Sequence, residues 1–300
     1  MNPQQLGFAY ALLAYGMWGS FPLFFHLLAE ISSTQVIAQR ILWSLVFCAL
    51  LLTFLRRWPR ALTALRDGKL VLMLTCSALL VGLNWWIYVA AVARGEVVAS
   101  SLGYFMTPLC SVALARIFLK EQMNHYQRVA IALAVVGVLY FVAKIGSLPW
   151  VSLSLAVSFA IYGLIRKQTV VGPLSGLFVE TLVLAPLALG YLIWQSHLGQ
   201  NQFVQNGGFI TLLLISAGVL TALPLLAFAA AAERLSLTVL GFMMYLNPSL
   251  QFFFAITVLG ESINRDQLIS FCFIWVALIV FSLGSLPRRK ATSLTEPESV

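Results

Sequence analysis

The chain has 300 residues, of which 61% are hydrophobic and only 9% are charged. Soluble domains carry about 25% charged residues because their surface faces water, so this composition excludes an ordinary soluble globule and predicts an integral membrane protein. The net charge of +8 does not indicate binding to nucleic acid, because the basic residues fall in small groups between apolar runs and form no continuous basic surface.

Apolar runs follow one another along the chain, each close to the roughly 20 residues that a membrane-spanning helix needs. We predict ten spans: 6–28, 36–55, 70–93, 99–119, 129–143, a run after Pro149 that ends at 167, 171–194, 209–232, 237–259 and 268–286. The segment 56–69 is predicted to be a basic loop and 195–208 a polar loop. The first run lacks the basic start and the cleavage site of a signal peptide, so we expect it to be retained as a helix.

Most basic residues lie on one side of these predicted spans. With the N-terminus inside, the inside loops hold thirteen Lys and Arg residues: Arg56, Arg57, Arg60, Arg66, Lys69, Lys120, Arg128, Arg166, Lys167, Arg234, Arg288, Arg289 and Lys290. The outside loops hold three: Arg94, Lys144 and Arg265. Because cytoplasmic loops are enriched in Lys and Arg, we predict an even number of spans and both termini in the cytoplasm, with a disordered tail at 288–300.

A weak internal repeat relates the two halves of the chain at an offset of about 140 residues. The matching segments are Tyr15-Gly16 with Tyr162-Gly163, Asn84 and Tyr88 with Pro224 and Phe228, Leu102-Gly103-Tyr104 with Leu240-Gly241-Phe242, and Pro108 and Glu121 with Pro248 and Glu261. A unit of five spans is odd in number, so the second copy must be inverted in the membrane, as in many secondary transporters. The predicted fold is an all-α membrane protein of ten helices in two inverted five-helix repeats, 1–145 and 146–287.

Each half carries a glycine followed by a proline inside an apolar run: Gly103 and Pro108 in the first half, Gly241 and Pro248 in the second. Proline removes one helical hydrogen bond and kinks the axis, and in lipid the freed carbonyl needs a neighbour, water or a ligand. The pattern indicates two helices that bend around a central cavity and act in gating, with Asn247 beside one break. Simple packing of membrane helices is the alternative.

Aromatic and amide side chains form a second candidate set: Trp18, Asn84, Trp85, Trp86, Tyr104, Tyr162 and Tyr245. Trp and Tyr often anchor span ends at the membrane interface. Asn84 lies more than half-way along its run, where an amide without a partner costs free energy. A cavity lined by aromatic rings and a few amides suits a small amphipathic or aromatic solute; the alternative is that these side chains only anchor the helices.

Two charged residues, Arg40 and Glu180, lie inside runs at equivalent places of the two halves. Ionisable residues within a span are candidates for function. The inverted arrangement puts them at different depths, so we expect no direct ion pair between them. Glu180 is the only carboxylate well inside a span, which makes it the candidate for coupling transport to protons. A carboxylate satisfied by neighbouring helices is the alternative.

Sites for catalysis, metals or cofactors are not indicated by the sequence. The four cysteines lie inside apolar runs, without the spacing of a disulfide framework or a zinc site. The three histidines lie at span ends or in loops without paired acids, and there is no P-loop for ATP. We therefore expect no enzymatic activity, no cofactor and no metal.

Several stretches resemble the EamA-type transporters of the drug/metabolite transporter superfamily. These are Gln39-Arg40 with Trp43-Ser44, Gly82 with Asn84-Trp85, Ser101 to Phe105 with Pro108, 146–149, Tyr162-Gly163 with Arg166-Lys167, and 273–278. The resemblance covers about residues 6–286, which is nearly the whole chain. Gln39 departs from this pattern, since histidine is expected there in this family, and glutamine offers no protonatable group at that position.

The resemblance implies a ten-helix fold of two inverted repeats, with a central cavity lined by the first, third, fourth, sixth, eighth and ninth runs. It also implies transport of small organic molecules across the bacterial inner membrane without ATP, and a link to chloramphenicol sensitivity. Carried over position by position, the substrate-binding residues would be Trp18, Asn84, Trp85, Tyr104, Tyr162, Tyr245 and Asn247.

Two alternatives stay open: an amino-acid exporter within transport, and a non-transporting membrane scaffold as a different class. The expected partners are a small-molecule substrate and the lipid bilayer, with protons as the candidate coupling ion. The sequence leaves open whether the chain is a monomer or a dimer.

Overall fold

The computed structural model describes residues 2–28, 30–93, 97–145, 150–203, 207–258 and 265–285. Within these ranges the chain forms twelve α-helices and no strand. They are α1 (Pro3–His26), α2 (Ser33–Phe54), α3 (Trp58–Arg66), α4 (Gly68–Ala93), α5 (Val97–Phe118), α6 (His125–Ile145), α7 (Trp150–Gln168), α8 (Pro173–His197), α9 (Gly207–Arg234), α10 (Leu237–Met243), α11 (Leu246–Thr257) and α12 (Arg265–Ser285). The predicted tail, 288–300, and the junction of the two halves at 146–149 lie outside the described residues.

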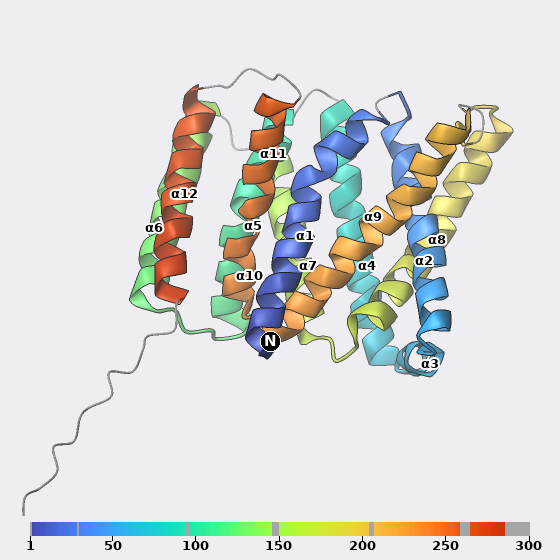
Figure 1. Ribbon diagram of the computed structural model, residues 1–300, viewed down its shortest axis with the longest axis horizontal. Helices are drawn as coiled ribbons and strands as arrows, with labels where there is room; N and C mark the ends of the chain where they lie inside the picture. Colours follow the sequence, from blue (N-terminus) through green and yellow to red (C-terminus); the bar gives the residue numbers. More distant parts are fainter. Residues whose placement is uncertain are drawn as a thin grey trace, which may run out of the picture.

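The long helices stand side by side and run alternately in opposite directions (Figure 1). α1 begins and α12 finishes at the same end of the bundle, which we call the terminal end (Figure 1). The connection between α1 and α2 lies at the opposite end, which we call the distal end. The short helix α3 differs from the others because it lies across the terminal end (Figure 1). The chain therefore passes repeatedly from one end of the bundle to the other.

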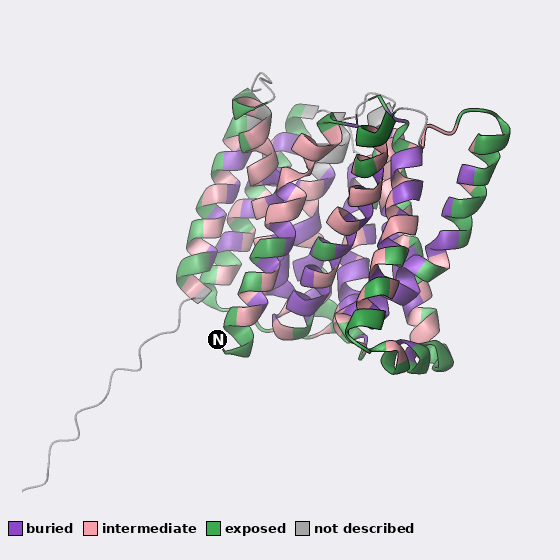
Figure 2. Cartoon of the chain, turned by 45° about the vertical axis from the view of Figure 1, so that its right-hand side comes forward, coloured by how far each residue is buried: buried purple, intermediate pink, exposed green. Residues whose placement is uncertain are grey.

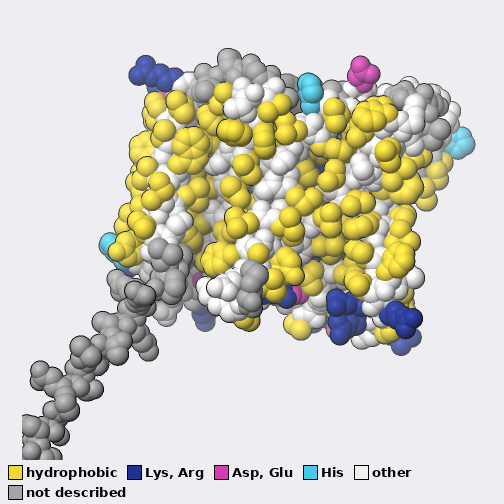
Figure 3. Space-filling model, viewed as in Figure 1, with side chains coloured by type: hydrophobic (Ala, Val, Ile, Leu, Met, Phe, Trp, Pro, Cys, Tyr) yellow, Lys and Arg dark blue, Asp and Glu magenta, His cyan; other side chains and the backbone are white. Residues whose placement is uncertain are grey.

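Eight helical segments in the described part of the chain are long and apolar enough to cross a membrane, and α10 with most of α11 forms one of them, Leu237–Phe254. α5 and α12 contribute shorter apolar stretches, Gly103–Phe118 and Leu268–Gly284. Apolar side chains cover the flanks of the bundle (Figure 3), as with Leu187, which is 67% exposed. Buried residues gather in its interior (Figure 2). Monomeric soluble proteins rarely expose apolar surface on this scale, so the chain is a multi-pass membrane protein.

Basic side chains gather at the terminal end, below the apolar flanks (Figure 3). Those around α3 are all exposed: Arg56, Arg57, Arg60, Arg66 and Lys69. Charged side chains avoid the hydrocarbon of a membrane and remain near its faces. The apolar flanks therefore span the membrane, and the terminal end lies at one of its surfaces.

The prediction of a loop at 56–69 was wrong, because this segment contains helix α3. Pro59 lies in the first turn, where its missing N–H costs no hydrogen bond, and Ala61 and Ala64 are buried at helical spacing. The Trp58 ring packs against Phe178 of α8, with 5.2 Å between the ring centroids. The short apolar face of α3 rests on the bundle while its arginines face outwards. The helix was not predicted because the many basic residues of this segment made it read as a loop.

The predicted run 237–259 is divided into α10 and α11, which meet at Met244 and Tyr245. Pro248 has no N–H to donate to the Met244 carbonyl four residues earlier. The Asn247 N–H donates to that carbonyl instead, at 3.0 Å. The tighter turn interrupts the helix. α5, in contrast, continues as one helix through Pro108, so the two proline elements differ in structure.

Helices from the two halves of the chain pack mainly against each other. α1 contacts α9 and α11, α2 contacts α8 and α9, α4 contacts α7 and α8, α5 contacts α7 and α10, and α6 contacts α12. The approach of α2 and α9 is especially close, since a Cβ atom added to Gly218 would lie 2.5 Å from the Trp43 carbonyl carbon. The Ser44 hydroxyl donates to the Gly218 carbonyl at 2.8 Å. The bundle is therefore one body, not two separate five-helix units.

Candidate functional site

A central cavity of about 300 Å³ lies among the helices of both halves. Its lining comes from α1, α2, α4, α5, α7, α9 and α11, with the α1–α2 connection and Met244: Trp18, Phe21, Pro22, Phe25, Leu28, Ile31, Ser33, Val36, Ile37, Arg40, Asn84, Trp85, Tyr88, Val89, Tyr104, Phe159, Leu225, Met244, Asn247 and Gln251. Ser33, at the start of α2, is exposed. The cavity therefore reaches towards the distal end.

A wider depression of about 410 Å³ lies between α2 and α8 and is lined mostly by apolar side chains. Its lining includes Val46, Leu189 and Ile193, which are between 44% and 50% exposed. This depression faces the outer, apolar surface of the bundle. The central cavity, which joins elements of both halves and contains polar groups, is the stronger candidate site.

Arg40 brings a positive charge to the central cavity. Its Nε donates to the Thr221 hydroxyl of α9 at 2.7 Å. The guanidinium carbon lies 5.7, 5.1 and 5.0 Å from the ring centroids of Phe21, Phe25 and Trp85. Cation–π contacts within about 6 Å are attractive, so three rings and one hydroxyl hold the guanidinium in place.

Three amides line the same cavity. The Asn84 Nδ2 donates to the Leu155 carbonyl and the Ser158 hydroxyl of α7, both at 2.9 Å. The Gln251 Nε2 donates to the Asn247 Oδ1 at 2.7 Å and lies 3.4 Å from the Trp18 carbonyl. Pro22, four residues after Trp18, cannot bond that carbonyl. The amides therefore link α4 to α7 and α11 to the proline break of α1.

A cluster of five rings lies between the cavity and the terminal end. This aromatic plug consists of Tyr15, Trp18, Phe159, Tyr162 and Phe228, whose contacting ring centroids are 5.6–6.3 Å apart. Trp18 belongs to both the plug and the cavity wall. The Tyr15 hydroxyl donates to the Leu240 carbonyl of α10 at 2.9 Å. The plug packs against the terminal side of the cavity, whose wall contains two of its rings, Trp18 and Phe159.

Two charged residues bind the end of α9, the α9–α10 connection and the start of α10 at the terminal end. The Glu121 carboxylate, in the α5–α6 connection, accepts from the Leu237 and Thr238 N–H groups at 2.7 and 3.0 Å. An anion at this position suits the positive end of the helix dipole. The Lys167 amine donates to the Ala232 carbonyl at 2.8 Å and to the Leu235 carbonyl. These bonds tie the start of α10 to neighbouring elements.

The structure brings five of the seven predicted substrate-binding residues to the cavity wall: Trp18, Asn84, Trp85, Tyr104 and Asn247. Arg40, predicted from its charge, also lines the cavity. Trp86, the other member of the aromatic set, is 60% exposed on the flank. The sequence reasoning missed Gln251, although its spacing of four residues from Asn247 puts both amides on one face of a helix.

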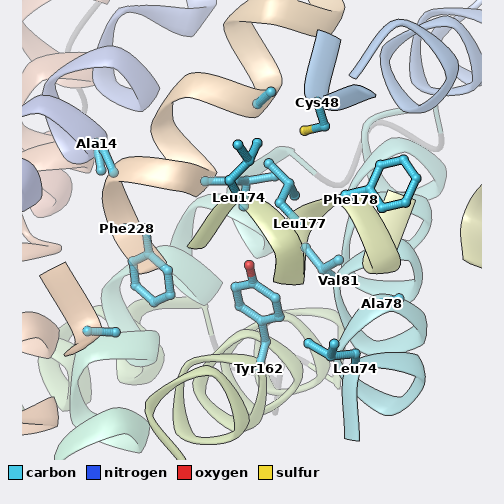
Figure 4. Close-up of a cluster of buried hydrophobic side chains, with 14 of the residues drawn as sticks. Ala14, Cys48, Leu74, Ala78, Val81, Tyr162, Leu174, Leu177, Phe178 and Phe228 are labelled. Atoms are coloured by element: carbon cyan, nitrogen blue, oxygen red, sulfur yellow. The ribbon is translucent and has the colours of Figure 1, made fainter. Parts of the chain in front are cut away.

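Tyr162 and Tyr245 lie away from the cavity wall. Tyr162 is 1% exposed and belongs to the plug, with its hydroxyl directed towards Leu174 and Leu177 of α8 (Figure 4). Tyr245 is fully buried beside Phe242, in a second apolar cluster with α6 and α12. Neither side chain is part of the cavity lining.

Glu180 lies in a different part of the bundle from Arg40. Its carboxylate accepts from the Ser77 hydroxyl of α4 and lies 3.6 Å from the Arg166 Nη1 of α7. Both charged side chains are almost fully buried. The placement of Arg166 in a loop was therefore wrong, because a short connection brings the end of α7 against the start of α8. Glu180 is thus paired with Arg166, and Arg40 is bonded to Thr221.

The predicted gating glycines lie at close helix contacts. A Cβ atom on Gly103 would lie 3.1 Å from the Ser152 carbonyl oxygen of α7, and one on Gly241 would lie 3.2 Å from the Pro108 carbonyl oxygen. Gly103 therefore allows α5 to approach α7, and Gly241 allows α10 to approach α5. Pro248 lies in the first turn of α11. These contacts correspond to the packing alternative and leave a role in gating as a prediction.

Known proteins are similar to this chain over nearly its whole length. Residues 5–143 match the EamA-like transporter family. The chain is 41% identical to an uncharacterized transporter of Vibrio cholerae, over 97% of this chain and 98% of that protein. It is 40% identical to Protein RarD of Escherichia coli, over 96% and 97%. It is 32% identical to Chloramphenicol-sensitive protein RarD of Pseudomonas aeruginosa, over 95% and 97%.

A crystal structure of a protein with 14% sequence identity superposes with a TM-score of 0.68, over 94% of this chain and 96% of that chain. This likeness bears on the fold alone. The relatives that match over nearly their full length show which family the chain belongs to, and they confirm the resemblance predicted from the sequence. The chain belongs to the EamA-like transporter family and is of the RarD type.

Proposed function

We propose that the chain is a secondary transporter that moves a small organic metabolite or drug across the bacterial inner membrane by alternating access. The observation that carries this proposal is the central cavity, which combines aromatic, amide and guanidinium groups inside a membrane bundle. It reaches towards the distal end, and the aromatic plug lies on its terminal side. A carrier needs a site that is open to one side at a time.

Ten spans in two inverted repeats, 1–145 and 146–287, underlie the proposed mechanism. Helices at the same position in the two repeats correspond to each other: α1 to α7, α2 to α8, α4 to α9, α5 to α10–α11, and α6 to α12. The contact between α1 and α9 then corresponds to the contact between α7 and α4. In the same way, the contact between α5 and α7 corresponds to the contact between α11 and α1. The contact of α2 with α9 corresponds to that of α8 with α4. This matching of contacts supports the repeats.

The proposed orientation has the terminal end in the cytoplasm. Basic residues around α3 are at this end (Figure 3), and cytoplasmic loops carry an excess of Lys and Arg. Both termini are then cytoplasmic, and the cavity faces outwards. In the opposite state, α1 and α10 would separate at the Tyr15–Leu240 bond, with Gly103, Pro108, Gly241 and Pro248 as candidate sites of bending.

Trp18, Asn84, Trp85, Tyr104 and Asn247 are the proposed substrate-binding residues, and their position on the cavity wall supports that role. Proton coupling at Glu180 is a second, separate proposal. This carboxylate lies away from the cavity, among Ser77 and Arg166, so it would act through the packing of α4, α7 and α8 and not by touching the substrate.

The proposal is tested with purified protein in liposomes, using labelled amino acids and chloramphenicol under imposed ion gradients. Chloramphenicol is included because of the name of the Pseudomonas aeruginosa relative. We expect at least one solute to move. Leu225→Trp fills the cavity and should stop the flux, whereas Leu223→Trp, on the same helix at a side chain 38% exposed, should leave it unchanged. Absence of flux for every solute and gradient, or equal flux in the two variants, contradicts the proposal and favours the scaffold alternative.

A further inference from the structure

Arg40 has hydrogen-bonding capacity that the described part of the chain does not use. Its Nε donates to Thr221, which leaves the four N–H groups on its two Nη atoms without an acceptor among the described residues. The rings of Phe21, Phe25 and Trp85 offset part of the cost of desolvating the cation. They do not replace an oxygen acceptor for those four N–H groups. The guanidinium is thus held from one side and free on the cavity side.

The positive charge of Arg40 also has no carboxylate partner in the described residues. The described carboxylates are engaged or exposed elsewhere: Glu121 at α10, Glu180 with Arg166, Glu233 with Arg234, Asp266 with Lys144, and Glu30 and Asp67 at exposed connections. Arg40 is half-buried on the cavity wall, where its charge attracts an anion more strongly than it would in open water. The cavity, as described, therefore carries one uncompensated positive charge.

The walls around this charge are aromatic and the available space is small. Trp18, Phe21, Phe25, Trp85 and Tyr104 surround the cavity, whose volume of about 300 Å³ equals that of about ten water molecules. A single ring with a short substituent is of this size. Planar rings favour an aromatic or otherwise apolar body.

We propose that the cavity carries organic monoanions: a carboxylate accepts hydrogen bonds from the free N–H groups of Arg40, and an apolar or aromatic body lies against the rings. This inference rests on the proposed transport function and names its substrate class. One cation matches one negative charge, so a dianion would bring a charge without a partner. An amino acid would bring an ammonium group, for which the described cavity wall offers no carboxylate.

Three probes that share a ring and chain length separate these possibilities: 3-phenylpropionate, its amide, and phenylalanine. They differ in charge, being an anion, a neutral molecule and a zwitterion. In liposomes containing the full-length protein, we expect the carboxylate to move at least about tenfold faster than the other two. This factor corresponds to one charge-assisted hydrogen bond.

Variants of Arg40 locate the selectivity. Arg40→Gln should raise the KM for 3-phenylpropionate about 10- to 100-fold and so remove the preference for the carboxylate over the amide. Arg40→Lys keeps the charge but not the two-pronged geometry, so its KM should lie between those of the wild type and Arg40→Gln. If Arg40→Gln does not fold, the preference of the wild type and the KM of Arg40→Lys decide the question.

Equal rates for the three probes, faster flux of the amide or the zwitterion, or an unchanged KM in folded Arg40→Gln would overturn the monoanion proposal. So would flux of other solutes in the broader panel with none of 3-phenylpropionate. In each of these cases the transport function stands. Absence of flux for every solute, in contrast, counts against the transport function itself.

Discussion

Replacing Glu180 with Gln removes the negative member of a buried ion pair. Its carboxylate and the Arg166 guanidinium are 3.6 Å apart, with side-chain exposures of 3% and 2%. Removing one partner of such a pair costs about 3–5 kcal/mol, because the other charge stays buried and unpaired. We therefore expect Glu180→Gln to lower the thermal midpoint by roughly 5–15 °C, using the few degrees per kcal/mol that apply to chains of this size.

The double variant Arg166→Met/Glu180→Gln separates this structural cost from a role in coupling. Arg166 has buried Nε and Nη1 atoms without hydrogen-bond partners in the described residues, so the pair is imperfectly satisfied and an apolar replacement is close to neutral. The free energy of unfolding should return to within about 1 kcal/mol of the wild type. If Glu180 is the proton-coupling group, this stable double variant still fails to transport solute driven by a pH gradient.

Two results would refute the reasoning. A Glu180→Gln protein as stable as the wild type would show that the pair does not hold α7 and α8 together. A double variant as unstable as the sum of both single variants would show that the two charges do not interact. Restored stability together with restored pH-driven flux would instead remove Glu180 from the transport mechanism. Thermal unfolding in detergent and flux in liposomes are measured on the same preparations.

Three further variants test the packing and the closure of the terminal end. Gly218→Ala places a methyl group against the backbone of α2 and should cost about 1–3 kcal/mol, seen as a lower thermal midpoint; Gly190→Ala, with no neighbour within 4 Å, is the control, and equal midpoints would contradict the close contact. Tyr15→Phe removes the bond to the Leu240 carbonyl, worth about 0.5–1.5 kcal/mol, and should lengthen spin-label distances between α1 and α10 at the terminal end; unchanged distances would exclude this bond as a closing contact. Glu121→Ala leaves two N–H groups of α10 without their acceptor at a cost of about 1 kcal/mol, so hydrogen exchange in the first turn of α10 should become faster, and an unchanged rate would contradict the capping role.

The membrane character and most helix positions could be predicted from the sequence, because a helix that crosses the membrane needs an apolar run of about 20 residues. Local exceptions were harder to predict. The helix α3 was missed because five basic residues surround its small buried face of Ala61 and Ala64. The division between α10 and α11 depends on which N–H group donates to the Met244 carbonyl, and in the structure this is the Asn247 N–H.

The sequence predicted which types of residue line the cavity, but only some of the individual lining residues. Asn84 and Trp85 were recognisable because amides are costly in mid-span. Tyr162 and Tyr245 are not in the cavity lining, and the sequence could not show this because it does not record how each helix is rotated about its axis. The contact of Arg166 with Glu180 depends on the tight connection of α7 and α8. The sequence analysis had put Arg166 in a loop and Glu180 inside a span, so it did not predict this contact.

The uncompensated charge of Arg40 has an electrical consequence. If the cargo is a monoanion, the loaded site is neutral and the empty site is positive, so each cycle moves one net charge across the membrane. A potential of 100 mV, negative inside, is worth about 2.3 kcal/mol per charge, which sustains an outward concentration ratio of about 50-fold. Export of an anion then draws its driving force from the voltage, and an ionophore that clamps the potential at zero abolishes accumulation without any change in pH.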